Sequence, residues 1–240
     1  MRMSLAAMIA ASAAVSGCQI HDSDGEAAVS RNYQVGNFQQ IEVAGPYNVE
    51  VRTGGTPSVS GQGAQKLMNR TVVEVRGDKL VIHPQEHRGW FHMGWGSHRS
   101  AKFTVTVPQL SGATIAGSGD IHVDQVHGTS FEGTVAGSGG LGINTLDVQS
   151  LKLAIAGSGG AKASAGRAQS VKYDIAGSGD IDATNVQAQN ADVSIAGSGS
   201  IRAHASGTAE VSIMGSGDVT ITGGAKCRVT KAGSGNAHCS

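Results

Sequence analysis

Three groups of residues in this sequence have types and spacings that could do chemistry. Cys18 follows Val15-Ser16-Gly17, a run of small residues typical of the site where a lipoprotein signal peptide is cleaved and the cysteine thiol is lipidated. Aspartates follow several Gly-Ser-Gly triplets, and carboxylates that recur with a repeat can bind calcium. The third group, an insert at residues 83–102, is rich in histidine and tryptophan.

The N-terminal segment predicts export and a lipid anchor. Arg2 is followed by the apolar run Leu5–Val15, which is too short to span a bilayer core of about 30 Å. We therefore interpret residues 1–17 as a lipoprotein signal peptide, Cys18 as the lipidated residue that ties the chain to a membrane, and 18–32 as a polar tether. The alternative is an ordinary signal peptide that happens to contain a cysteine. Gln19, where an Asp would retain the protein at the inner membrane, favours the outer membrane, on its periplasmic or surface face.

The two remaining cysteines are predicted to form a disulfide. An exported chain works in an oxidising compartment, and Cys227 and Cys239 lie six residues before and six after Gly233. A sharp turn at Gly233 would bring them together and staple the C-terminal end. The alternative is a pair of free thiols in a frayed tail.

The histidine- and tryptophan-rich insert is a candidate binding loop. Aromatic and guanidinium groups on an exposed loop suit recognition of sugar or protein. Imidazole also suits copper and zinc, but there is no HExxH motif and the histidine spacings fit no rigid element, so no metal site is predicted. The third alternative is a loop that only packs against the body of the protein. The residues concerned are His83, His87, Trp90, His92, Trp95 and His98.

A repeat of about 20 residues determines the expected fold. Gly-Ser-Gly begins at positions 117, 137, 157, 177, 197, 215 and 233, so the spacing is 20 residues and then 18. Apolar and polar residues alternate on both sides of each triplet, as in Val171-Lys172-Tyr173-Asp174-Ile175, and period two is typical of half-buried strands. We predict an all-β, right-handed parallel β-helix-like solenoid in which equivalent residues stack. An antiparallel meander with a hairpin at each triplet is the alternative.

The domain organisation follows from the same pattern. Residues 33–240 are expected to form one solenoid, with irregular coils over 33–110 and regular repeats over 111–240. Within the irregular part, Gly45-Pro46 and Gly77-Asp78 predict turns between strands. In the last repeat Lys231 takes a position held elsewhere by Ile or Val, as a coil that faces water should have.

The order of motifs resembles a known family. Phe38-x-x-Ile41-x-Val43-x-Gly45, Leu80-x-Ile82, Val105-x-Val107-Pro108-x-Leu110 and the Gly-Ser-Gly-Asp-Ile turns are similar to the putative auto-transporter adhesin head domain, also called the GIN domain. The resemblance covers about Tyr33 to the C-terminus. It implies an all-β, β-helix-like fold on secreted or lipid-anchored envelope proteins, and it brings no catalytic residues.

The predicted function is therefore non-enzymatic, without a cofactor. Acidic and basic residues balance at 18 each, so no net field attracts nucleic acid. We expect a rigid surface that binds an envelope glycan or protein, with the oligomeric state left open. The alternatives are a polysaccharide-active β-helix enzyme and a periplasmic metal-binding protein. The enzyme would need Asp with Arg or Lys in one groove, and we expect the basic residues to lie in different columns, namely Lys152, Lys162, Arg167, Lys172 and Arg202.

Overall fold

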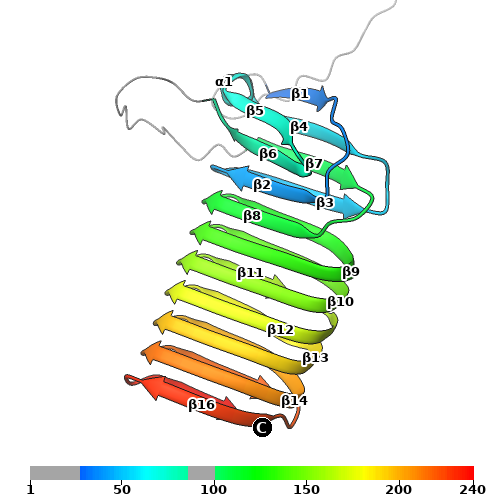
Figure 1. Cartoon of the computed structure of the whole chain (residues 1–240). Helices are drawn as coiled ribbons and strands as arrows, with labels where there is room; N and C mark the ends of the chain where they lie inside the picture. The colour runs from blue at the N-terminus through cyan, green and yellow to red at the C-terminus, as the bar shows by residue number, and fades with distance from the viewer. Residues whose placement is uncertain (1–27, 86–100) are drawn as a thin grey trace, which may run out of the picture.

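The structure, a computed structural model, describes residues 28–85 and 101–240 and is nearly all β, with 77% strand and 3% helix. Its strands form one 17-stranded sheet that winds into stacked coils (Figure 1). The helix of the described chain is α1 (Gln65–Asn69). The parallel stack makes about 6 turns.

The regular half of the chain confirms the solenoid. Each strand pairs in parallel with the strand one repeat later, so that Gly140 lies beside Gly160 and Ile155 beside Ile175. Antiparallel hairpins at the triplets are therefore excluded. The strands are β8 (Gly112–Gly117), β9 (Asp120–Gly137), β10 (Gly140–Gly157), β11 (Gly160–Ala163), β12 (Gly166–Gly177), β13 (Asp180–Gly197), β14 (Ser200–Gly215), β15 (Asp218–Thr222), β16 (Lys226–Ala232) and β17 (Asn236–Cys239).

The N-terminal half joins the same sheet by a less direct path. The strands β2 and β3 form a coil that pairs in parallel with β8 and β9 on one side and with β6 and β7 on the other. The chain thus forms β2 and β3 first, then β6 and β7 on one side of them, and then β8 and β9 on the other side. The strands here are β1 (Ala28–Tyr33), β2 (Gln40–Ala44), β3 (Tyr47–Thr53), β4 (Ser58–Ala64), β5 (Thr71–Arg76), β6 (Lys79–Pro84) and β7 (Ala101–Val107).

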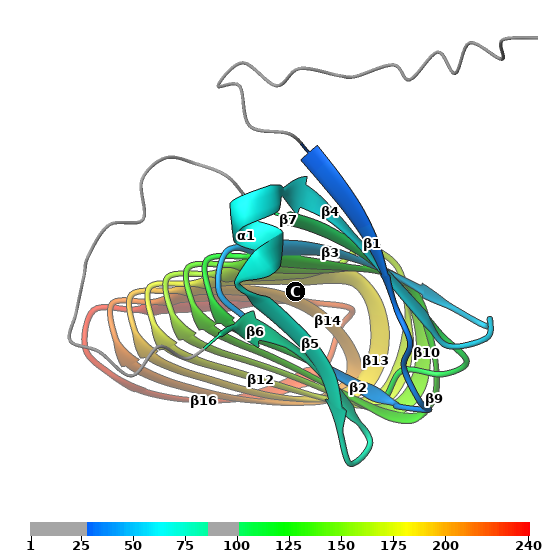
Figure 2. The same cartoon turned by 90° about the horizontal axis from the view of Figure 1, so that it is seen from above.

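Antiparallel strands and α1 close the N-terminal end of the stack. The strand β4 runs antiparallel to both β7 and β1, and Figure 2 shows α1 and β5 over the mouth of the coils. Met68 of α1 is fully buried. Thr71 donates a hydrogen bond to the Leu67 carbonyl oxygen at 2.8 Å, and the Tyr47 ring meets Phe103 edge-on at 5.7 Å between centroids. This end of the core is sealed by packed side chains.

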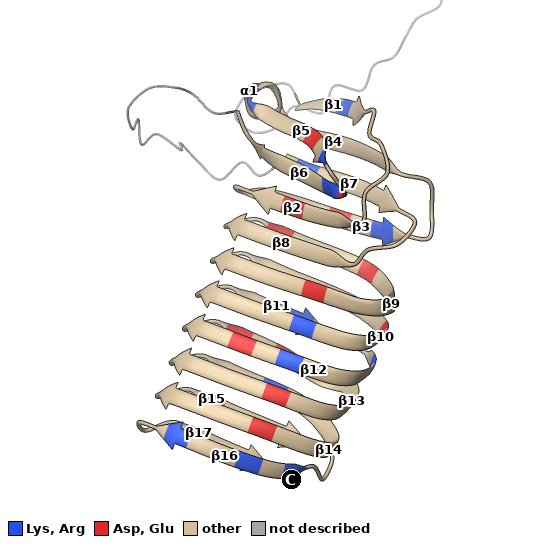
Figure 3. Ribbon diagram, in the orientation of Figure 1, with Lys and Arg blue, Asp and Glu red and all other residues tan. Residues whose placement is uncertain are grey.

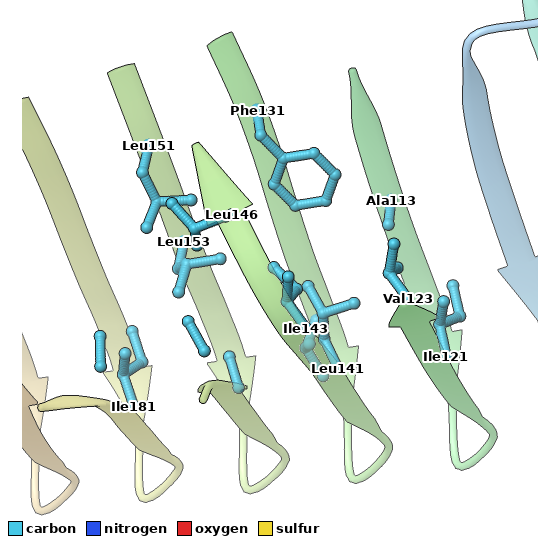
Figure 4. Packing of buried hydrophobic residues seen from close by; sticks show 14 of the residues in the cluster. Ala113, Ile121, Val123, Phe131, Leu141, Ile143, Leu146, Leu151, Leu153 and Ile181 are labelled. Atoms are coloured by element: carbon cyan, nitrogen blue, oxygen red, sulfur yellow. The ribbon is translucent and has the colours of Figure 1, made fainter. Parts of the chain in front are cut away.

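Apolar ladders fill the interior of the coils. Side chains from successive coils point into one continuous core (Figure 4), and the column from Ile115 to Ile213 is at most 3% exposed. Burying a side chain of this size contributes about 1.5–3 kcal/mol. Because a single coil cannot cover its own apolar face, each repeat depends on its neighbours.

The Gly-Ser-Gly turns are where adjacent coils come closest. At Gly157 the backbone has φ of +131°, and a Cβ there would lie 2.4 Å from the carbonyl oxygen of Gly137. That oxygen accepts hydrogen bonds from the amides of Ser158 and Gly159 at 2.9 and 3.0 Å. Glycine is therefore needed at this position for two reasons. It tolerates the positive φ, and its lack of a Cβ leaves the space in which adjacent coils form their hydrogen bonds.

The change of repeat length from 20 to 18 residues is absorbed far from the triplets. Between β13 and β14 the register shifts after Ala183 and again after Ala188, whereas Gly197 still lies beside Gly215. Two residues are thus removed from the bend opposite the Gly-Ser-Gly turn, and the glycine ladder continues.

Substituting Gly157 by Ala should lower the free energy of unfolding by at least about 2 kcal/mol, since it adds backbone strain and a collision with Gly137. Ser158→Ala, at the exposed position next to it, should stay within about 0.5 kcal/mol of the unaltered protein. Chemical denaturation of both variants measures the difference. Equal stability of the two variants would contradict the close approach described here.

Candidate functional site

The structure describes one of the six predicted binding-loop residues. His83 lies on β6 with its side chain 18% exposed, and its Nε2 is 3.0 Å from Glu74 Oε1 on β5. Hydrogen bonds to His83 and Arg76 lower the pKa of Glu74. His83 thus cross-links two strands of the N-terminal end. The other five loop residues, His87, Trp90, His92, Trp95 and His98, lie outside the described residues, as does Cys18.

The aspartates that follow Gly-Ser-Gly serve the turns. Asp120 accepts a hydrogen bond from the amide of Gly140 at 2.7 Å, and Asp180 accepts one from the amide of Ser200 at 3.2 Å. Asn236 donates to Asp218 at 3.1 Å. Each carboxylate binds the next coil, and within residues 28–85 and 101–240 no group of three or more His, Cys, Asp or Glu could hold a metal ion.

The last coil is stapled by a disulfide. Cys227 on β16 and Cys239 on β17 are bonded, with their Cα atoms 6.6 Å apart. The ladder from β14 holds β16 on one side, whereas on its other side no strand of residues 28–85 and 101–240 covers it, and Val229 is 43% exposed. The disulfide therefore fixes the position of the residues on either side of Cys227, which are Lys226 and Arg228.

The expectation that the basic residues lie in different columns was wrong. Lys152 and Lys172 are register partners, and Asp182 lies between Lys162 and Arg202 in another column. The physical reason is the repeat itself, because residues 20 positions apart stand side by side. Figure 3 shows one of these columns running along the stack, from Glu132 and Lys152 through Lys172, Asp192 and Glu210 to Arg228.

Several charges on the coil flanks are paired between coils. Lys152 lies 2.7 Å from Glu132, Lys172 lies 2.8 Å from Asp192, and Arg167 lies 2.7 Å from Asp147. A hydrogen bond from Arg167 lowers the pKa of Asp147, the direction expected for a carboxylate held ionised. These pairs are exposed, so each adds little to stability.

A groove lies on the flank of the last coils. It has a volume of about 390 Å³ and crosses β12, β13, β14 and β16, so it runs along the axis of the stack. One edge is a row of exposed polar residues, and the other edge is the charged column. The floor lies between them, over the small buried residues Ala191 and Ala209. The lining residues are Ser170, Val171, Asn190, Ala191, Asp192, Thr208, Ala209, Glu210, Lys226 and Arg228.

The hollow coincides with a loss of interior volume. The buried residues of this column are Phe131 and Leu151 in the earlier coils, and they give way to Val171, Ala191 and Ala209. We attribute the groove to this decrease in side-chain volume. Because protein interiors are close-packed, the backbone at a corner with smaller buried side chains lies closer to the axis of the solenoid.

The charges at the C-terminal end of the groove are unpaired. Thr208 donates to Asn190 at 2.8 Å, and Asp192 is held by Lys172. Within the described part of the chain, the side chains of Glu210, Lys226 and Arg228 have no hydrogen bond or ion pair. Arg202, exposed on β14 outside the groove, also lacks a hydrogen bond or ion pair within the described residues, so what distinguishes the groove is that three such side chains lie together there.

Sequence reasoning missed this groove, although one signal was available. Lys226 and Arg228 stand one repeat after Thr208 and Glu210. Aligning the last coil on the repeat would have placed two cations beside the unpaired carboxylate. The groove brings together acidic and basic groups, which is the arrangement that the enzyme alternative required.

Comparison with known proteins agrees with the fold. The family model described as putative auto-transporter adhesin, head GIN domain, matches residues 37–225. No curated protein matches the chain. The match to the family ends one residue before Lys226, so the two groove cations lie outside it.

Solved structures share the architecture. A putative adhesin from Bacteroides fragilis superposes with a TM-score of 0.80 at 23% identity, covering 89% of this chain and 97% of that one. A putative lipid binding protein from Parabacteroides distasonis gives a TM-score of 0.70 at 23% identity, covering 90% and 98%. A putative adhesin from the same species gives 0.66 at 19%, again covering 90% and 98%. At these identities the likeness establishes the fold.

Removing the disulfide should loosen the last coil and leave the others in place. In Cys227→Ala/Cys239→Ala, loss of a staple worth about 2–4 kcal/mol should speed amide hydrogen exchange in β16 and β17 at least tenfold. Exchange in β12 and β13 should not change, because their neighbours on both sides remain. Unchanged exchange in β16 would mean that hydrogen bonds to β14 hold the terminal coil without help.

Proposed function

The chain belongs to the putative auto-transporter adhesin, head GIN domain family, and we propose that it is a non-enzymatic lipoprotein of the cell envelope that binds or adheres through its solenoid flank. The groove across β12 to β16 carries this proposal, since it combines a cavity with unpaired charged side chains. A family and structural neighbours described as putative adhesins support it.

A solenoid suits binding because it holds a surface rigidly. Strands and the glycine turns fix each groove residue on a hydrogen-bonded ladder, so little conformational entropy is lost when a ligand docks. The same rigidity positions side chains at a regular interval of about 4.8 Å along the axis. A ligand with a repeating chemical structure can therefore meet equivalent side chains on successive coils.

The proposed lipid anchor agrees with the position of the groove. Lipidation at Cys18 would place the membrane ten residues before Ala28, and β1 lies at the capped end of the stack (Figure 1). The groove lies at the opposite end, roughly 30 Å farther along the axis at 4.8 Å per coil. Among the helices of residues 28–85 and 101–240, none is long and apolar enough to cross a membrane. An anchored solenoid of this kind would hold its binding surface away from the lipid.

The mixed charges in the groove also favour a second candidate, a polysaccharide-active enzyme. Glu210 would be its acid or base, with Arg228 beside it. Against this, Asp192 and Glu210 are both exposed on the flank, whereas a glycoside hydrolase separates its acid from its base or nucleophile by their different environments. Release of reducing ends from a polysaccharide by the full chain, lost in Glu210→Gln, would favour the enzyme over the binding protein.

Filling the groove should weaken binding without unfolding the protein. Thr208→Trp places an indole at an exposed position on the groove edge. The full chain in detergent should bind one or more members of a panel of immobilised envelope polysaccharides and extracellular proteins, and Thr208→Trp should weaken that binding at least tenfold. Surface plasmon resonance measures both.

Ser130→Trp is the matched control. Ser130 is exposed in the same corner row of the solenoid, and it lies outside the groove. It should bind as the unaltered protein does. If the full chain binds nothing on the panel, or if both variants bind normally, the groove is not the functional surface.

A further inference from the structure

The groove's free charges point to a particular class of ligand. We propose, building on the binding function above, that the groove takes an acidic glycan, a sugar chain that carries carboxylate groups. Lys226 and Arg228 would hold a carboxylate of the glycan, and Glu210 with the polar edge would hold its hydroxyl groups. The observation behind this is that three unpaired charged side chains gather at one end of the groove, whereas Lys152, Arg167 and Lys172 elsewhere on the flank are each held in an ion pair.

The two cations are placed to act together. They stand two residues apart on β16 and both are exposed, so their backbone positions are about 7 Å apart on one face of the strand. Arg228 presents a planar fork that suits bidentate contact with a carboxylate, and Lys226 adds a second positive charge. Neither has to break an ion pair to do so. The Cys227–Cys239 disulfide lies between them and fixes the strand that carries both.

The remainder of the groove suits sugar hydroxyl groups. Glu210 accepts hydrogen bonds, and Ser170, Asn190 and Thr208 can both donate and accept them. These groups recur from coil to coil along the groove. A chain of sugar rings presents hydroxyl groups at regular intervals along its length, so several coils would engage one strand of glycan.

The lining disfavours peptides and acyl chains. Its apolar members are Val171, Ala191 and Ala209, which are buried beneath the floor, and no aromatic side chain lines it. Protein partners are usually anchored by aromatic or large apolar side chains in such pockets, and an acyl chain needs an extended apolar wall. Neither is present among the residues that line the groove.

The test compares two probes that differ in charge and by one methyl group on each carboxyl. An oligogalacturonide carries one carboxylate per sugar, and its methyl ester keeps the chain while removing the charge. Isothermal titration of the full chain should show binding of the acid, at least tenfold weaker binding of the ester, and weaker binding of the acid at high salt. Lys226→Gln and Arg228→Gln should each weaken binding of the acid at least threefold and leave binding of the ester unchanged.

Arg167→Gln serves as the control for loss of a positive charge. Arg167 is an exposed cation of the same solenoid, paired with Asp147 and outside the groove, so its loss should not alter binding. Equal binding of acid and ester would overturn the acidic-glycan inference, and so would a preference for an acidic peptide offered as a third probe. If either of these outcomes is found and the binding is still lost in Thr208→Trp, the proposed function stands. If Thr208→Trp has no effect on the binding, the acidic-glycan inference and the proposed function are both wrong.

Discussion

The contact between successive glycine turns governs the geometry of this protein. The first glycine of each triplet up to Gly215 places a carbonyl oxygen where the following coil donates one or two amides, and the space for that contact exists because there is no Cβ. Any other residue would push the coils apart at this edge, and the interior ladders would lose their packing as a result. The spacing and alignment of the flank side chains, including those of the groove, follow from this one backbone contact.

Charged columns on the flank are compatible with this stacking. In the column from Glu132 to Arg228, each neighbouring pair of like charge is followed by a pair of opposite charge. Lys172 forms ion pairs with Asp192 on the next coil and with Asp174 on its own coil. Exposed pairs of this kind contribute little energy. A slip by one coil would also set opposite charges beside each other, such as Glu132 with Lys172 and Lys152 with Asp192, so the register is specified by the glycine turns and not by this column.

The repeat made much of the fold predictable, and the end of the chain shows where such reasoning stops. Alternating residues around evenly spaced glycines predicted parallel coils, and the structure confirms them. The insertion of β2 and β3 between later strands was not predictable, since pairing across the stack leaves no local trace in a period-two pattern. The groove was missed for another reason. It depends on which side chains stand beside each other across coils and on the interior narrowing at Ala191 and Ala209, neither of which a motif records.

The two ends of the solenoid solve the same problem in different ways, and this difference explains where a binding surface could arise. At the N-terminal end, antiparallel strands and α1 bury the core with packed apolar groups, including Met68. At the C-terminal end no strand of the described residues covers the last coil, which carries the charges of Lys226, Arg228 and Lys231 and a disulfide. Charges here discourage pairing of an exposed edge strand with another chain, and they have a neighbouring coil, β14, on one side only. The requirement to cap the stack thus leaves cations unpaired at the end of the flank groove, where a soluble anionic ligand can reach them.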